Sequence, residues 1–304
     1  MNSQAIVFSN KTKAILAMGI WAILSPLNGM FVKLMPSEIG SVLIVEISLA
    51  FFLLPGLVFL VTEGREHIAV RQMRIICLRG GACLASIAAT FMAVRKIDYA
   101  TVYFFIMTGP LLASLGGSIL FSERVQRKHF LASLATLAGA FLALTPEIKS
   151  STSELVLMGL VVLTSSALAL TSRYVGRSPN VIRNTVISLS VAGWVVLPFA
   201  LFQLSTLDLS AWPVMAGLST TNFLAILLGA YAYEKATISS NAPYELLKVV
   251  CAVMLGAVVF GASPTNQVLW GVLIILAATS TTASHDLNFF VKVKTGFTSP
   301  QNGP

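Results

Sequence analysis

Long apolar runs recur along the whole sequence and restrict its fold more than any other feature. Ten runs are separated by charged or turn-forming residues. They lie at about residues 13–34, 40–61, 73–95, 98–120, 128–145, 154–173, 184–204, 211–234, 238–260 and 267–286. Most are close to the ~20 residues that a helix needs to cross a bilayer. Charged residues make up 11% of the chain, against roughly 25% in a soluble domain. The sequence therefore predicts an all-α integral membrane protein with ten transmembrane helices.

The basic residues predict how these helices are oriented. Most of the 20 lysines and arginines lie in the two tails and in the loops after the second, fourth and sixth runs. Because cytoplasmic loops carry the excess of Lys and Arg, we expect both tails, residues 1–12 and 287–304, to be cytoplasmic. We expect the inner membrane of a bacterium as the location. The net charge of +8 is accounted for by these loops, and no nucleic-acid partner is predicted.

The three cysteines give no sign of a metal site or of a disulfide framework. Cys77, Cys83 and Cys251 lie inside apolar runs, without CxxC or Cys/His spacing. We interpret them as small core residues and predict no metal and no cofactor.

The ninth run, residues 238–260, carries two charges in an otherwise apolar segment. Asn241, Glu245 and Lys248 follow one another at i, i+4 and i+7, which places them on one face of a helix. Charges inside a membrane usually face a protein interior or a watery cavity. One interpretation is an internal pair between Glu245 and Lys248 that only stabilises packing. The other is a polar stripe that lines a central cavity and binds a substrate.

Depth estimates place further polar residues near this stripe. At ~1.5 Å per residue, Arg79 lies ~9 Å, Glu245 ~10 Å and Lys248 ~15 Å from the cytoplasmic edge. Asn28 and Glu46 share a level nearer the outer edge. We predict that all five belong to a substrate-binding site in two polar layers. Two alternatives remain open, because Arg79 can snorkel to the surface and Glu46 can be a shallow interfacial acid.

Prolines and aromatic residues in the apolar runs add candidate hinges and cavity walls. Pro26, Pro110 and Pro243 lie in the first, fourth and ninth runs, where a proline removes a helical hydrogen bond and permits gating. Proline is also common in membrane helices that do not move. Tyr103 and Tyr244 are candidate aromatic walls of the substrate site. The alternative for such residues is an interfacial aromatic belt.

The ten runs also divide into two similar sets of five, residues 13–145 and 154–286. A shift of 139 residues keeps all five runs in register. The shift superposes three identical residues: Ala93 on Ala232, Lys96 on Lys235, and Phe121 on Phe260. Because five is odd, the second set enters the membrane from the opposite side. Such inverted repeats are typical of transporters whose substrate site lies near the midplane.

Several short motifs resemble the EamA-type repeats of the drug/metabolite transporter superfamily. They are Leu78-Arg79-Gly80, the stretch from Ala93 to Ala100 that leads to Gly109-Pro110, Phe121-Ser122-Glu123, and Gly271 in the tenth run. The resemblance covers residues 13–286. It implies two inverted five-helix repeats, with spans 1–4 and 6–9 around a central cavity and spans 5 and 10 to one side. It also implies alternating access for small metabolites.

The chain departs from that pattern at two positions. The second repeat has Ala262 where the first has Glu123, so only one repeat carries the acid at the helix end. Glu46 stands in the second span where many members of the family carry a basic residue.

Two classes of function follow from these observations. A secondary transporter explains the repeat, the buried charges and the lack of a GxxxxGK[ST] phosphate loop. An integral membrane enzyme that acts on a lipid or carrier substrate is the alternative, and it requires paired carboxylates or Ser/His/Asp chemistry. The loop acids Glu63, Glu66, Glu123 and Glu147 are scattered, and we interpret each as solvated. We therefore predict a transporter and not an enzyme.

The signs of the charges favour a substrate class. Lys248 offers only donors, whereas Glu46 and Glu245 offer only acceptors when ionised. A cavity lined by both signs suits an amino-acid-like zwitterion or an S-adenosylmethionine-like compound. The coupling ion is H⁺ or Na⁺, and the partners are this small molecule and the lipid bilayer. Homodimer formation is left open by the sequence.

Overall fold

The computed structural model describes residues 10–63, 70–97, 99–123, 125–143, 151–178, 180–261 and 265–295. Within these ranges every regular element is a helix. The α-helices are α1 Asn10–Leu34, α2 Ser41–Glu63, α3 Val70–Lys96, α4 Tyr99–Phe121, α5 Arg127–Ala143, α6 Thr152–Gly176, α7 Val181–Leu201, α8 Trp212–Lys235, α9 Ile238–Glu245, α10 Lys248–Phe260 and α11 Asn266–Thr295. Two short 3₁₀ turns, η1 Leu204–Thr206 and η2 Leu209–Ala211, connect α7 to α8.

Eight segments of the described chain are long and apolar enough to cross a membrane, when α9 and α10 are taken together as one. Helix α5 has 17 residues, and the apolar part of α11 is the short stretch Asn266–Thr281. Helix α11 itself continues to Thr295, past residue 286 where the sequence predicts the last span to end. The all-helical membrane fold is confirmed, and the count of ten spans stays a prediction.

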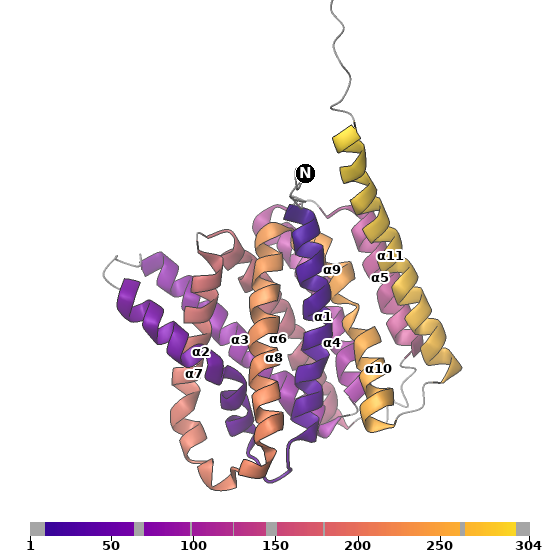
Figure 1. Cartoon of the computed structure of the whole chain (residues 1–304). Helices are drawn as coiled ribbons and strands as arrows, with labels where there is room; N and C mark the ends of the chain where they lie inside the picture. The colour runs from indigo at the N-terminus through magenta and orange to yellow at the C-terminus, as the bar shows by residue number, and fades with distance from the viewer. Residues whose placement is uncertain are drawn as a thin grey trace, which may run out of the picture.

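Helices from the two halves of the chain pack against each other in pairs. Helix α1 packs mainly on α8, α2 on α7, α3 on α6, and α5 on α11. Helix α4 packs on α6 and on the α9–α10 segment. In Figure 1, α5 and α11 lie together at one side of the bundle, while α2 and α7 lie at the opposite side. The remaining helices form the centre of the molecule.

The ninth apolar run forms two helices. The sequence places it in a single helical span. Helix α9 ends at Glu245 and α10 begins at Lys248, with Leu246 and Leu247 in a turn between them. The carbonyl of Pro243, just before the break, accepts a hydrogen bond from the Thr279 hydroxyl of α11 at 3.4 Å. Broken helices are tolerated at membrane depth where neighbouring helices satisfy the backbone groups.

The other two proline positions do not break their helices. Helix α1 continues through Pro26, and α4 continues through Pro110. Near Pro26, two tyrosines of α4 hold the backbone of α1: Tyr99 donates to the carbonyl of Pro26, and Tyr103 donates to the carbonyl of Ser25 at 2.9 Å. A hinge role for the three prolines stays a prediction.

Helices α3 and α7 approach each other closely at a glycine. A Cβ atom on Gly80 would lie 2.4 Å from the backbone carbonyl oxygen of Ser188, closer than real Cβ atoms come to another atom. The contact therefore requires glycine. It also brings the side chain of the preceding residue, Arg79, against α7.

Candidate functional site

A cavity with about 120 Å³ of solvent space lies at the centre of the bundle. One water needs roughly 10–15 Å³ by the same kind of measure, so a small organic molecule fits. Its described lining comes from α1, α3, α4, α6, α8, α9 and α10, and includes no residue of α2, α5, α7 or α11. The fifth and tenth spans, α5 and α11, are expected to lie to one side of the cavity, and the lining agrees with this expectation. The expectation that the second and seventh also surround the cavity is not met here.

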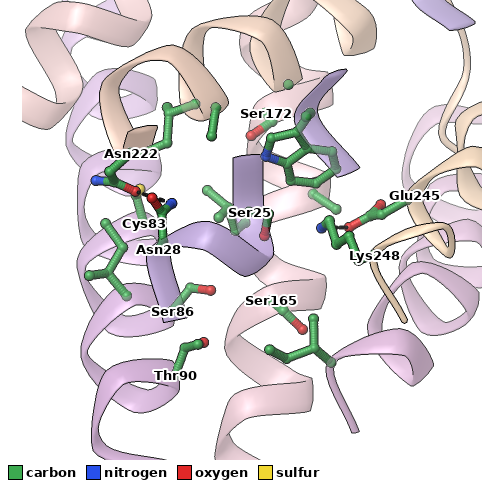
Figure 2. A pocket seen from close by; sticks show the side chains of 18 of the residues that line it. Ser25, Asn28, Cys83, Ser86, Thr90, Ser165, Ser172, Asn222, Glu245 and Lys248 are labelled. Atoms are coloured by element: carbon green, nitrogen blue, oxygen red, sulfur yellow. Dashed lines mark hydrogen bonds and ion pairs between the residues drawn. The ribbon is translucent and has the colours of Figure 1, made fainter. Parts of the chain in front are cut away.

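Glu245 and Lys248 face the cavity as a closed ion pair. The Lys248 ammonium lies 2.8 Å from Oε1 of Glu245, and the side chains are 3% and 7% exposed, respectively. The Tyr233 hydroxyl donates to Oε2 of Glu245 at 2.9 Å, and the Lys248 nitrogen lies 3.4 Å from the centre of the Trp21 ring. Figure 2 shows this pair across the cavity from Asn28 and Asn222. The sequence allows two interpretations of these residues, an internal ion pair and a cavity lining. In the structure Glu245 and Lys248 form the pair and also line the cavity.

The pair forms across the break in the ninth span. Glu245 is the last residue of α9 and Lys248 the first of α10. Two ions that leave water gain most from a partner at hydrogen-bonding distance. Glu245 has two such partners, Lys248 and Tyr233, whereas Lys248 has Glu245 as its hydrogen-bond partner and the Trp21 ring as a cation–π contact. The arrangement leaves the cavity wall near α9 without net charge.

Arg79 is the third charged residue in the cavity lining, and it is enclosed. Its side chain is 1% exposed, so it does not snorkel to the surface. Nη1 donates to the Ser188 hydroxyl at 3.0 Å, and the buried Nε has no hydrogen-bond partner among the described residues. Arg79 and Glu245 line the same cavity without forming an ion pair, because the contacts of Glu245 are to Lys248 and Tyr233.

Polar residues of α1 and α8 form a second group in the lining. Asn28 donates to the amide oxygen of Asn222 at 3.2 Å and accepts from the hydroxyl of Thr221. Asn222 in turn donates to the carbonyl of Ser48 at 2.8 Å, which connects α8 to α2. Tyr103 also lines the cavity, at the place where its hydroxyl meets α1.

Three residues that the sequence assigns to the site lie outside the cavity lining. Glu46 is buried in α2, and among the described residues neither of its carboxylate oxygens has a hydrogen-bond partner, while its depth in the membrane stays a prediction. The Asn241 amide donates to the carbonyl of Ala232 at 3.1 Å. Tyr244 is 2% exposed and packs in an apolar cluster with Met18. These three side chains do not face the cavity as predicted. The position of a residue along its helix predicts its depth, but the packing of neighbouring helices decides which face of the helix meets the cavity.

Glu123, interpreted from the sequence as a solvated loop acid, lies in the loop just after α4, but its side chain is enclosed by neighbouring helices, so the solvated interpretation is wrong. Its Oε1 lies 2.7 Å from Nε of Arg173 and 3.0 Å from Nη2 of Arg177, and its side chain is 7% exposed. Its Oε2 accepts from the backbone N–H of Ile238 at 3.3 Å. Arg173 also donates to the carbonyl of Tyr233 at 2.6 Å. This group, the Glu123 cluster, joins the ends of α4, α6, α8 and α9.

Sequence and structure comparisons agree with this architecture. Residues 152–283 match the model of the EamA-like transporter family. A solved structure, described only as a crystal structure of a protein, superposes with a TM-score of 0.66 at 16% identity, over 90% of this chain and 98% of that one. At that identity the likeness shows the fold alone. No curated protein matches the sequence.

Proposed function

We propose that this chain, a multi-pass membrane protein whose residues 152–283 form an EamA-like transporter domain, is a secondary active transporter. The match over residues 152–283 supports the resemblance to the drug/metabolite transporter superfamily, and among the motif residues Gly271 lies within it. The solute is a small organic metabolite that crosses by alternating access through the central cavity.

The observation that carries the proposal is the broken ninth span. Its two halves meet at the cavity and present Glu245 and Lys248 there, both almost fully buried. Discontinuous helices that meet at the membrane midplane are where secondary transporters bind substrates and coupling ions. Ionisable residues at membrane depth are costly and by default functional.

The pattern of helix contacts supports an inverted repeat, which alternating access exploits. If α1 corresponds to α6 and α3 to α8, the contact of α1 with α8 becomes the contact of α6 with α3, and both exist. The same exchange relates the contact of α2 with α8 to that of α7 with α3. The contacts of α2 with α7 and of α5 with α11 map onto themselves.

A membrane enzyme is the rival function, and the lining gives it little support. The described cavity residues include serine and threonine hydroxyls but no histidine that could act as their base. The single carboxylate in the lining is already held by Lys248 and Tyr233. Neither pattern is the paired-carboxylate or triad chemistry that hydrolysis needs.

The finer properties belong to the same proposal. The favoured solute is an amino-acid-like zwitterion or an S-adenosylmethionine-like compound, driven by H⁺ or Na⁺. The favoured location is a bacterial inner membrane with both termini in the cytoplasm. A homodimer is compatible with this arrangement.

Sealed proteoliposomes test the proposal directly. Vesicles with purified protein are given a mixture of amino acids, nucleosides, polyamines and S-adenosylmethionine, and their contents are analysed by mass spectrometry. A transporter accumulates at least one solute chemically unchanged, and protein-free vesicles do not. Conversion of a solute without accumulation would instead establish the enzyme. The Lys248→Met variant should be less stable but still monodisperse at the assay temperature, and it should lose uptake, because the lysine charge faces the cavity.

A further inference from the structure

The charges in the cavity lining do not balance. Three charged side chains line it, namely Arg79, Glu245 and Lys248. Glu245 and Lys248 neutralise each other at 2.8 Å. No acid of the described residues pairs with Arg79, whose side-chain hydrogen bond goes to the neutral Ser188. The described lining therefore carries a net charge of about +1, because arginine stays protonated in proteins.

Arg79 is a buried cation without an anionic partner among the described residues. It is 1% exposed, so water does not solvate it as it would a surface arginine. A guanidinium has five N–H donors, yet within the part of the chain that the structure describes Arg79 makes one side-chain hydrogen bond and its buried Nε makes none. A buried charge without a counter-ion is strongly unfavourable, and a bound anion removes that penalty.

Arg79 lies in the wall of the cavity, at one end of a row of small and polar side chains on α3. Cys83, Ser86 and Thr90 continue from it along the same face of α3, and all three line the cavity. Figure 2 shows these three side chains in a row along the helix. A solute whose body lies along this small and polar face has its end group beside the guanidinium.

We infer that Arg79 is the receptor for a carboxylate group of the transported solute. The assignment rests on the proposed transport function and specifies its substrate class. The planar guanidinium matches a carboxylate in a two-point hydrogen bond. A monoanion cancels the excess charge, whereas a phosphate dianion leaves a negative charge in the cavity. An amino group on the solute is optional, because Glu245 is already engaged by Lys248.

Binding of matched carboxylate and amide probes tests the assignment. The probes are 3-phenylpropanoate, 4-(methylthio)butanoate and 4-methylpentanoate, each with its amide, and the readout is the melting temperature of purified protein in detergent. At least one carboxylate should stabilise the wild type, with about tenfold or tighter binding than its amide, as expected for a hydrogen bond to a charged group. In Arg79→Gln the two members of each pair should bind within about twofold of each other.

A matched control separates binding from structure. Arg95, on the same helix, donates to the carbonyls of Pro36, Ser37 and Ile39 and does not line the cavity. Arg95→Gln should lower the melting temperature of the free protein and leave the carboxylate preference intact. Arg79→Gln should keep or raise that temperature, since it removes an uncompensated charge. Arg79→Lys should retain part of the preference.

The outcomes are distinct. Failure of every carboxylate to stabilise the wild type, or an undiminished preference in Arg79→Gln, overturns the assignment. A strong destabilisation of the free Arg79→Gln protein also overturns it, because Arg79 would then be a packing residue. Carboxylate binding without vesicle uptake leaves Arg79 in place and refutes transport. Uptake without carboxylate preference supports transport and refutes the assignment of Arg79.

Discussion

The ion pair across the helix break gives a prediction whose size follows from the structure. Lys248→Met leaves the Glu245 carboxylate, 7% exposed, with only the Tyr233 hydroxyl, and should cost about 3–5 kcal/mol of unfolding free energy. Glu245→Gln leaves the Lys248 ammonium over the Trp21 ring, a contact of about 2 kcal/mol when desolvated. The loss of unfolding free energy in Glu245→Gln should therefore lie at the lower end of this range, at about 3 kcal/mol.

The double variant should lose far less than the sum of the single losses. With both charges gone, a glutamine oxygen still accepts from Tyr233 and a methionine fills the volume of the lysine stem. A coupling of about 3 kcal/mol, the upper end of measured values, is expected between the two positions. The measurement is equilibrium unfolding in mixed micelles by titration with dodecyl sulfate, followed by loss of helical circular dichroism.

A partly exposed pair of the same chemistry is the control. Glu234 and Lys235 form an ion pair at the end of α8 with side chains 28% and 25% exposed. Its cycle should give at most about 1 kcal/mol of coupling. Additive losses at positions 245 and 248, or equal couplings for the two pairs, would refute the view that burial makes the central pair interdependent.

Two further predictions concern other contacts. Gly80→Ala should cost about 1–3 kcal/mol because its methyl group meets the carbonyl of Ser188, whereas Gly81→Ala, with open space around it, should be neutral by the same unfolding assay. Equal effects would mean that α3 and α7 do not touch there. Glu123→Gln should lower stability by about 1–3 kcal/mol, since two arginines lose their shared acid and one of them is partly solvated. An unchanged unfolding midpoint would show that the cluster is not formed in the membrane protein.

The sequence identifies several of the cavity residues, because a charge or an amide stands out in an apolar run. Arg79, Glu245, Lys248 and Asn28 all line the cavity. Asn222 carries the same signal, an amide in the middle of an apolar run, and could have been included on that basis.

Side-chain direction is where the sequence is insufficient. Apart from Ser48, the residues of α2 around Glu46 are apolar, so no polar stripe shows which way that carboxylate points. Pro243 marks the ninth run as a candidate hinge, but the position of the break is not evident, since it falls at Leu246 and Leu247 and leucine is a strong helix former. The Glu123 cluster depends on arginines about 50 residues further along the chain, whose proximity only the packing of α4 on α6 creates.

The helix break also has a consequence for how the protein is made. A single lysine at the centre of an isolated helix costs roughly 2.5–3.5 kcal/mol on insertion scales, and the α9–α10 segment carries a glutamate as well. Trp21 and Tyr233, the groups that contact these charges, lie in α1 and α8. Both helices precede α9 in the chain and are synthesised before it. The segment that is hardest to place in lipid thus leaves the ribosome when its partners are already in the membrane. If the chain were expressed as two fragments divided before α9, this order of synthesis would be lost.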